Sequence, residues 1–230
     1  MKKASLGAFV AAAATIFTFA CETQADIIFG AATDITTEAD DIITIGTLHA
    51  AVNAAEDSQA DVILNGVLFE SGDVNAATNI STLGFTSSNA AELNPNNLGD
   101  TAEYNRFLGD IDFASGVTGD ITIENLIEGN EYALQVFFVD DRTGNNDNRV
   151  TTISAVGGTG SVALNDQFAV GNFVADSTGE FTFNVATAGA GGPNITGFQV
   201  RDLGAVVPEP SSLTVLGMGI SGLLLRRRRA

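Results

Sequence analysis

Apolar residues in the central part of the chain occur in short runs separated by Gly, Asn, Asp and Thr. A succession of such runs bounded by turn-forming residues is typical of an all-β sandwich or barrel. The pattern therefore predicts an all-β protein, built as a single jelly-roll-like antiparallel β-sandwich. We expect strands at residues 26–30, 42–48, 62–64, 67–69, 79–85, 119–125, 131–139, 150–156, 167–175, 180–186 and 194–202.

The segment DVILNGVLFE carries the clearest turn signal in the chain. Two apolar triplets flank Asn65 and Gly66. Asn-Gly readily adopts the two positive φ angles of a type I′ turn, so the segment is predicted to form a β-hairpin.

The last third of the body alternates apolar and polar residues. We expect three successive antiparallel strands there, with ADSTGE as one turn, and bulges at Gly171–Asn172 and at Gly197, where the alternation slips. The residues predicted to point inward are Phe168, Val170, Phe173, Val174, Phe181, Phe183, Val185, Ile195, Phe198 and Val200.

One segment, GDTAEYNRFLGD, departs from the β pattern. Asp100 is placed to cap a helix that has Glu103 at its third position. Tyr104, Phe107 and Leu108 then share one face, and a glycine follows them. The sequence thus predicts one short helix that covers an end or edge of the sandwich and places Tyr104 in the core.

Both ends of the chain differ from the body. Two lysines precede an apolar run at residues 6–20 and a stretch of small residues that ends at Ala25, which is the build of a secretory signal peptide. Cleavage after residue 20 would instead place Cys21 first, as in a lipoprotein, although the residues before it lack the aliphatic position of a lipobox. We therefore divide the chain into a signal peptide with its helix at 1–25, a β-sandwich at 26–205 and a C-terminal tail at 206–229.

The body is strongly acidic. The whole chain has 28 acidic and 10 basic residues. Removing Glu22 and Glu209, the two N-terminal lysines and the four C-terminal arginines leaves 26 acids and 4 arginines, a net charge of −22. Such a body repels nucleic acid and anionic membranes, which require clusters of Lys and Arg. The acidity suits either solubility in salty surroundings or collective binding of divalent cations.

The C-terminal tail combines three features. Pro208, Glu209 and Pro210 hold the chain extended, an uncharged apolar run at 211–225 follows, and the tail closes with a basic cluster, Arg226, Arg227, Arg228 and Arg229. The apolar run is shorter than the about 20 residues that usually span a bilayer, so snorkelling arginines or a thinned membrane would have to help. The arginines would stay cytoplasmic by the positive-inside rule, which places the body outside.

This tail resembles the PEP-CTERM sorting signal of exported bacterial proteins. The resemblance implies transient insertion of a hydrophobic helix in the membrane and processing near Pro208–Pro210 by an exosortase-type membrane protease. Release or attachment in the extracellular polysaccharide matrix or at the cell surface would follow. The alternative is a simple tail anchor that is not processed.

The body is also similar to galactose-binding-like β-sandwich domains. The likeness lies in EYALQVFFVDDR, VGNFVADSTGEFTFNV and NITGFQVRDL. It implies the fold and no defined ligand.

The loop VDDRTGNNDN is the candidate cation site. Asp140, Asp141 and Asp147, with three asparagines, offer the oxygen ligands that Ca²⁺ prefers. The EF-hand spacing is missing, and Asx and Gly residues also serve an ordinary turn. Arg142 and Arg149 flank the loop and could pair with its carboxylates. Ca²⁺ is the one cofactor that the sequence suggests.

Catalytic signals are weak. His49 is the only histidine, at an expected strand end where a structural role is common, and no phosphate-binding loop is found. We therefore expect an exported structural or adhesive protein without enzymatic activity. A calcium-assisted carbohydrate-binding module is the alternative, weakened by the absence of Trp, and a glycan hydrolase comes third.

Overall fold

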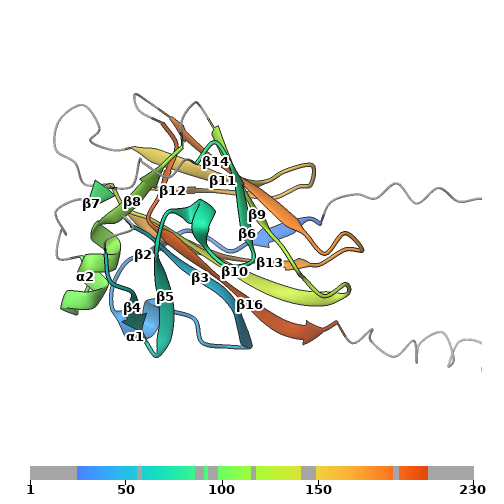
Figure 1. Ribbon diagram of the computed structural model, residues 1–230, viewed down its shortest axis with the longest axis horizontal. Helices are drawn as coiled ribbons and strands as arrows, with labels where there is room; N and C mark the ends of the chain where they lie inside the picture. The colour runs from blue at the N-terminus through green and yellow to red at the C-terminus, as the bar shows by residue number, and fades with distance from the viewer. Residues whose placement is uncertain are drawn as a thin grey trace, which may run out of the picture.

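The computed structural model describes residues 25–55, 59–85, 91–92, 98–114, 118–140, 149–188 and 192–206 of the 230. Three sheets run through this part of the chain (Figure 1). The largest contains β1 (Ile27–Phe29), β2 (Thr33–Asp34), β3 (Thr47–Ala54), β4 (Val62–Leu64), β5 (Val67–Gly72), β10 (Asn130–Phe138), β13 (Gln167–Val174) and β16 (Gly197–Ala205).

The second sheet contains β6 (Ile80–Leu83), β9 (Thr118–Ile123), β11 (Val150–Ala155), β12 (Ser161–Leu164) and β14 (Phe181–Ala188). A small third sheet contains β7 (Ala91–Glu92), β8 (Asp110–Phe113) and β15 (Asn194–Ile195). The helices are α1 (Glu38–Asp41), α2 (Ala102–Gly109) and a 3₁₀ turn, η1 (Val74–Ala76). The all-β class is confirmed for the described residues, where α1 is a helix that the sequence did not predict; the expected signal helix and the C-terminal helix at 211–225 lie outside them.

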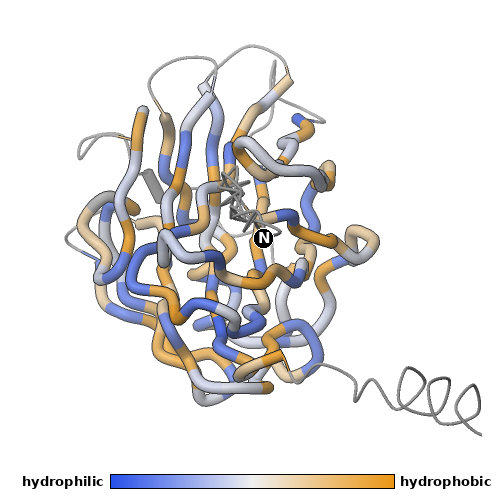
Figure 2. The backbone as a smooth tube through the Cα atoms, turned by 90° about the vertical axis from the view of Figure 1, so that its right-hand side faces the viewer, coloured by the Kyte–Doolittle hydropathy of each residue, from blue (hydrophilic) through white to orange (hydrophobic). Residues whose placement is uncertain are grey.

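The main core lies between the two larger sheets. Phe183 of β14 packs edge-on against Phe198 of β16 at 5.6 Å between ring centroids, and Phe173 of β13 stacks on Phe181 at 4.0 Å. Figure 2 shows the corresponding alternation of hydrophobic and hydrophilic segments along the strands. Burial of these side chains on both inner faces holds the sandwich together.

A second core covers the outer face of the largest sheet. Tyr104, Phe107 and Leu108 of α2 are buried there, and the Phe107 ring meets Phe137 of β10 edge-on at 5.2 Å. Because both faces of β10 are covered, this strand is apolar along most of its length rather than alternating. The predicted helix and its buried face are confirmed.

The cap of α2 differs from the prediction. Thr101 is the N-cap residue, and its Oγ1 accepts a hydrogen bond from the Tyr104 amide at 3.1 Å. Asp100 instead accepts from the Glu38 amide at 2.8 Å and so ties α2 to α1. Sequence spacing alone did not separate these neighbouring candidates, because both residue types cap helices well.

The predicted hairpin at 62–69 is confirmed. Asn65 and Gly66 have φ angles of 47° and 76°, and β4 pairs antiparallel with β5 on either side of them. The sheet is not purely antiparallel as expected, since β3 and β5 pair in parallel from Val52 to Ala54.

The strand expected at 42–48 is wrong for most of its length, because β3 begins only at Thr47. Residues 42–46 cross a row of polar side chains on the largest sheet: Gln135 accepts from the Ile43 amide, Gln199 donates to the Ile43 carbonyl, and Arg201 donates to three carbonyls of the segment. These side chains take the place of a neighbouring strand as hydrogen-bond partners.

The arrangement expected for the last third is also wrong. β13 and β14 are consecutive in sequence but belong to different sheets, and β16 lies between β10 and β3. Most predicted inward positions are buried, whereas Val174 is 44% exposed.

No bulge occurs at Gly171–Asn172, where the register with β10 is continuous. A Cβ at Gly171 would meet Phe29 and Ile27 side chains at 2.6–2.8 Å, and one at Gly197 would meet Phe107 at 2.6 Å. These glycines allow close packing of neighbouring elements. The register irregularities of β16 lie elsewhere, at Val200/Arg201 against β3 and opposite Glu131/Tyr132 of β10.

Candidate functional site

The C-terminal tail leaves the sandwich from a firmly fixed strand end. The Val206 amide donates to the Gly129 carbonyl at 3.1 Å, and Ala205 lies opposite Asn130. The Asn130 side chain donates to both carboxylate oxygens of Asp202 at 3.0 and 2.9 Å. Only one residue separates Val206 from Pro208 in the sequence, so the motif follows the folded body directly.

The motif residues Pro208, Glu209 and Pro210 and the basic cluster, Arg226 to Arg229, lie outside the described residues, as does the expected signal peptide up to residue 24. Among the residues that the structure describes, no helix is long and apolar enough to cross a membrane.

The Asp140 region lies at the opposite end of β10. Ala205 pairs with Asn130 at the start of this strand, whereas Gly197 pairs with Phe137 near its end. At about 3.3 Å per residue, the strand separates the two regions by roughly 26 Å. In Figure 1 the end of β16 lies at the lower right and α2 at the left.

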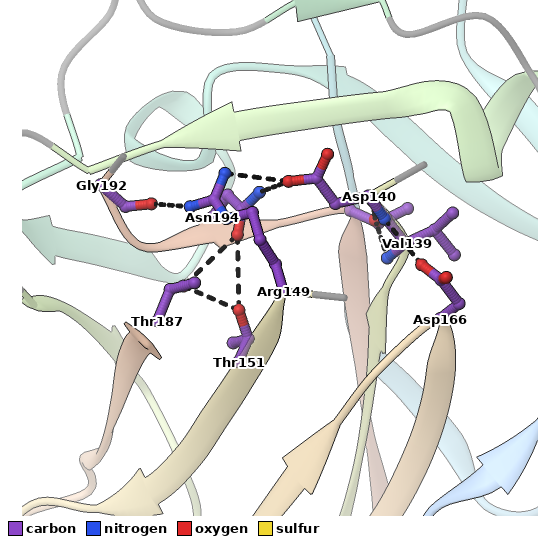
Figure 3. Close-up of polar contacts among 9 residues, drawn as sticks. Val139, Asp140, Arg149, Thr151, Asp166, Thr187, Gly192 and Asn194 are labelled. Carbon is purple, nitrogen blue, oxygen red and sulfur yellow. Dashed lines mark hydrogen bonds and ion pairs between the residues drawn. The ribbon is translucent and has the colours of Figure 1, made fainter. Parts of the chain in front are cut away.

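Asp140 is buried in a polar network at this end (Figure 3). Its Oδ2 accepts from Arg149 Nη1 and from Asn194 Nδ2, both at 2.9 Å. Arg149 also donates to the Gly192 carbonyl. The Thr151 and Thr187 hydroxyls hydrogen-bond each other at 2.7 Å and lie 3.4 Å from Asn194 Oδ1. The network joins β11, β14 and β15 to the end of β10.

Asp166 adds a second carboxylate to this region. Its Oδ1 accepts from the Asp140 amide at 2.9 Å. Burial raises the pKa of Asp166 above its usual value and the negative charge of Asp140 raises it further, while the hydrogen bond from the Asp140 amide acts in the opposite direction.

These contacts bear on the three predicted cation ligands, Asp140, Asp141 and Asp147. Asp140 forms an ion pair with Arg149, one of the two arginines that the sequence placed beside the loop. Asp141 and Asp147 lie outside the described residues. Within the described ranges, no group of three His, Cys, Asp or Glu side chains is arranged to hold a metal ion. A calcium site in the 140–148 loop stays a prediction.

His49 lies within β3 rather than at a strand end, and it is half-buried. Its Nε2 lies 2.9 Å from the Glu124 carbonyl oxygen, and its ring meets Tyr132 edge-on at 5.8 Å. His49 also lines a cavity of about 220 Å³ between β3 and β5. This cavity was not predictable from the sequence, because its walls come from three separate segments.

Asn194 was likewise missed as a polar anchor. It lies in an ordinary strand pattern, and its role depends on contact with Asp140, which is 54 residues away in the sequence.

The fold and the tail together define an exported all-β protein with a C-terminal sorting signal. Residues 206–229 match the PEP-CTERM protein-sorting motif, so the protein is of the exosortase-dependent exported type, and exosortase is the membrane protease that recognises such signals. No curated protein and no solved structure matches the chain. The likeness of the body to galactose-binding-like domains therefore stays a prediction.

Proposed function

We propose that the protein is a structural or adhesive component of the cell surface or extracellular matrix, without enzymatic activity. Its tail holds it in the membrane until an exosortase cleaves near Pro208–Pro210. The acidic β-sandwich is then released or attached to the extracellular polysaccharide.

The sorting motif at 206–229 is the observation that carries this proposal. The geometry of the body supports it. The tail leaves from Val206, beside Gly129, whereas Asp140 and Arg149 lie near the opposite end of β10. The strand separates the two ends by roughly 26 Å. A protein tethered by its tail would therefore hold the end with Asp140 at a distance from the tether, where it can reach a partner.

A calcium-assisted carbohydrate-binding module is the second candidate. Its support is the run of acidic and asparagine side chains at 140–148, and the ion pair of Arg149 with Asp140, which engages one of the three candidate ligands, counts against it. For the glycan hydrolase, the hydrogen bond of His49 to the Glu124 carbonyl is a structural role that gives no support to a general base.

The test is the intact mass of the protein recovered from its host, measured separately in membrane and extracellular fractions. We expect an extracellular species that begins at Asp26 and ends near Pro208–Pro210. Glu209→Ala should block this processing and leave full tail mass in the membrane fraction.

The control is Glu128→Ala, which removes an exposed carboxylate beside the tail exit but outside the motif, and which should be processed normally. Normal maturation of Glu209→Ala, or a wild-type protein that keeps its arginines and stays in the membrane, would refute sorting by cleavage.

A further inference from the structure

The cavity beside His49 arises where two strands of the largest sheet diverge. β3 and β5 pair only from Val52 to Ala54, opposite Glu70 to Gly72. Before this pairing the strands separate and leave a cavity of about 220 Å³. Its walls include Leu48 and His49 of β3, Leu68 and Glu70 of β5, and Ala77 and Thr78 from the segment before β6.

His49 is oriented by an irregularity in β3. The register with β16 passes from Ala50 opposite Val200 to Leu48 opposite Arg201, so His49 is the extra residue of a bulge. Bulges re-aim a side chain relative to the regular alternation. Here the ring reaches the Glu124 carbonyl with Nε2 at 2.9 Å.

This hydrogen bond determines the tautomer of His49. A carbonyl oxygen only accepts, so Nε2 must carry the proton. In the neutral ring Nδ1 is then a hydrogen-bond acceptor. Glu70 is exposed and contributes a carboxylate, and Thr78 contributes an exposed hydroxyl. Of these groups the Glu70 carboxylate only accepts hydrogen bonds, whereas the Thr78 hydroxyl both donates and accepts.

The charge of the surroundings favours a cation. The cavity lining contains Glu70 and no Lys or Arg. The body as a whole has 26 acidic residues and only four arginines. An anionic ligand would be repelled, whereas an ammonium group would be attracted and could donate up to three hydrogen bonds.

The volume of the cavity and the residues of its walls further restrict which ligand can bind. At about 30 Å³ per water molecule, the cavity corresponds to roughly seven waters, less than a drug-sized ligand requires. Leu48 and Leu68 are 38% and 44% exposed beside it. Exposed leucines next to a carboxylate and a hydroxyl suit a compact ring with one apolar face, hydroxyl groups and an amine.

We propose that this cavity binds the free-amine form of an amino sugar, one hexosamine unit at a time. The amine interacts with Glu70 and the ring lies against the two leucines. This proposal rests on the proposed matrix function, because the natural ligand would be an amino-sugar unit of the extracellular polysaccharide. It therefore names the ligand class for that function.

The experiment uses the full chain purified in detergent and follows its amide resonances by NMR during titration with glucosamine, N-acetylglucosamine and glucose. We expect glucosamine to shift amides around Glu70 and Thr78 with a Kd on the order of a few millimolar, as befits a ligand of this size. The two sugars without an amine should bind about tenfold more weakly or not at all.

Two variants locate the site. Glu70→Gln should weaken glucosamine binding about tenfold, since it removes a charge-assisted interaction. Thr78→Leu places bulk on an exposed residue at the cavity and should abolish the shifts. Glu180→Gln, an exposed carboxylate before β14, is the matched control and should bind as the wild type does.

Each other outcome overturns the proposal. Equal binding of glucose would show that the amine is not recognised, and tighter binding of an Nα-acetyl-lysine amide would make a peptide the occupant. The absence of any shift near the cavity would exclude a site there. These titrations do not depend on processing of the tail. If glucosamine does not bind but the tail is cleaved normally, the amino-sugar site is refuted and the proposed matrix function is not. If glucosamine binds but the tail is never cleaved, only the sorting step is refuted.

Discussion

The ion pair between Arg149 and Asp140 allows the sharpest test of the structure. The two side chains are 3% and 0% exposed, and Arg149 Nη1 lies 2.9 Å from Asp140 Oδ2. Arg149→Met removes the guanidinium and leaves the Asp140 carboxylate buried beside Asn194. Breaking a buried pair in this way destabilises a protein by about 3–5 kcal/mol.

This magnitude is large compared with the total free energy of unfolding, which is about 5–15 kcal/mol for a native protein. For a domain of this size, about 2–4 °C of melting temperature is lost per kcal/mol, so Arg149→Met should lower the Tm by roughly 6–20 °C. The protein has no Trp, so urea unfolding is best followed by circular dichroism.

Two further variants separate the ion pair from other effects. Asp140→Leu combined with Arg149→Met removes both charges and should recover much of the lost stability, because the unpaired charge is no longer buried. Arg106→Met is the matched control: Arg106 donates to the Asp61 carbonyl, so its loss should cost about 1 kcal/mol or less. If Arg149→Met unfolds within 1 kcal/mol of the wild type, the pair is solvated and the argument fails.

Three more predictions follow from the structure. Burial, and then the charge of Asp41, raises the pKa of Tyr104, and burial raises that of Tyr132, from the usual value of 10.0. Above about pH 10 the unfolded chain therefore loses its phenol protons while the folded protein keeps them. The free energy of unfolding should then fall as the pH rises beyond that value. Tyrosinate absorbance that grows before the protein unfolds would contradict this. Gly66→Ala places a side chain at a φ of 76° where no atom lies within 4 Å, so urea unfolding should show a loss of about 1 kcal/mol from backbone strain alone. If the loop at 140–148 binds calcium, Ca²⁺ should raise the Tm and Asp141→Ala should remove the effect; an unchanged Tm at millimolar Ca²⁺ would count against the site.

Features that depend on neighbouring residues were predictable. The hairpin at Asn65–Gly66 follows from the φ angles that these two residues tolerate, and the buried face of α2 follows from the spacing of Tyr104, Phe107 and Leu108. The sorting tail was predictable for the same reason, since its three parts are contiguous in the sequence.

Features that depend on partners far along the chain were not predictable. Residues 42–46 have the apolar pattern of a strand, yet they are held by Gln135, Gln199 and Arg201, more than 90 residues away. β13 and β14 follow one another with a short turn between them, but they lie in opposite sheets. The periodicity of apolar residues shows which side of a strand is apolar, but it does not predict which strand lies beside it.

The sequence by itself determined the all-β class, the local turns, the strong negative charge and the sorting tail, because each follows from composition or from residues close together in the chain. The tertiary structure decided the pairing of the strands, the burial of Asp140 with Arg149 and the cavity between β3 and β5. These features arise from contacts between segments distant in sequence, where the packing of both faces of a sheet outweighs the local preference of any one strand.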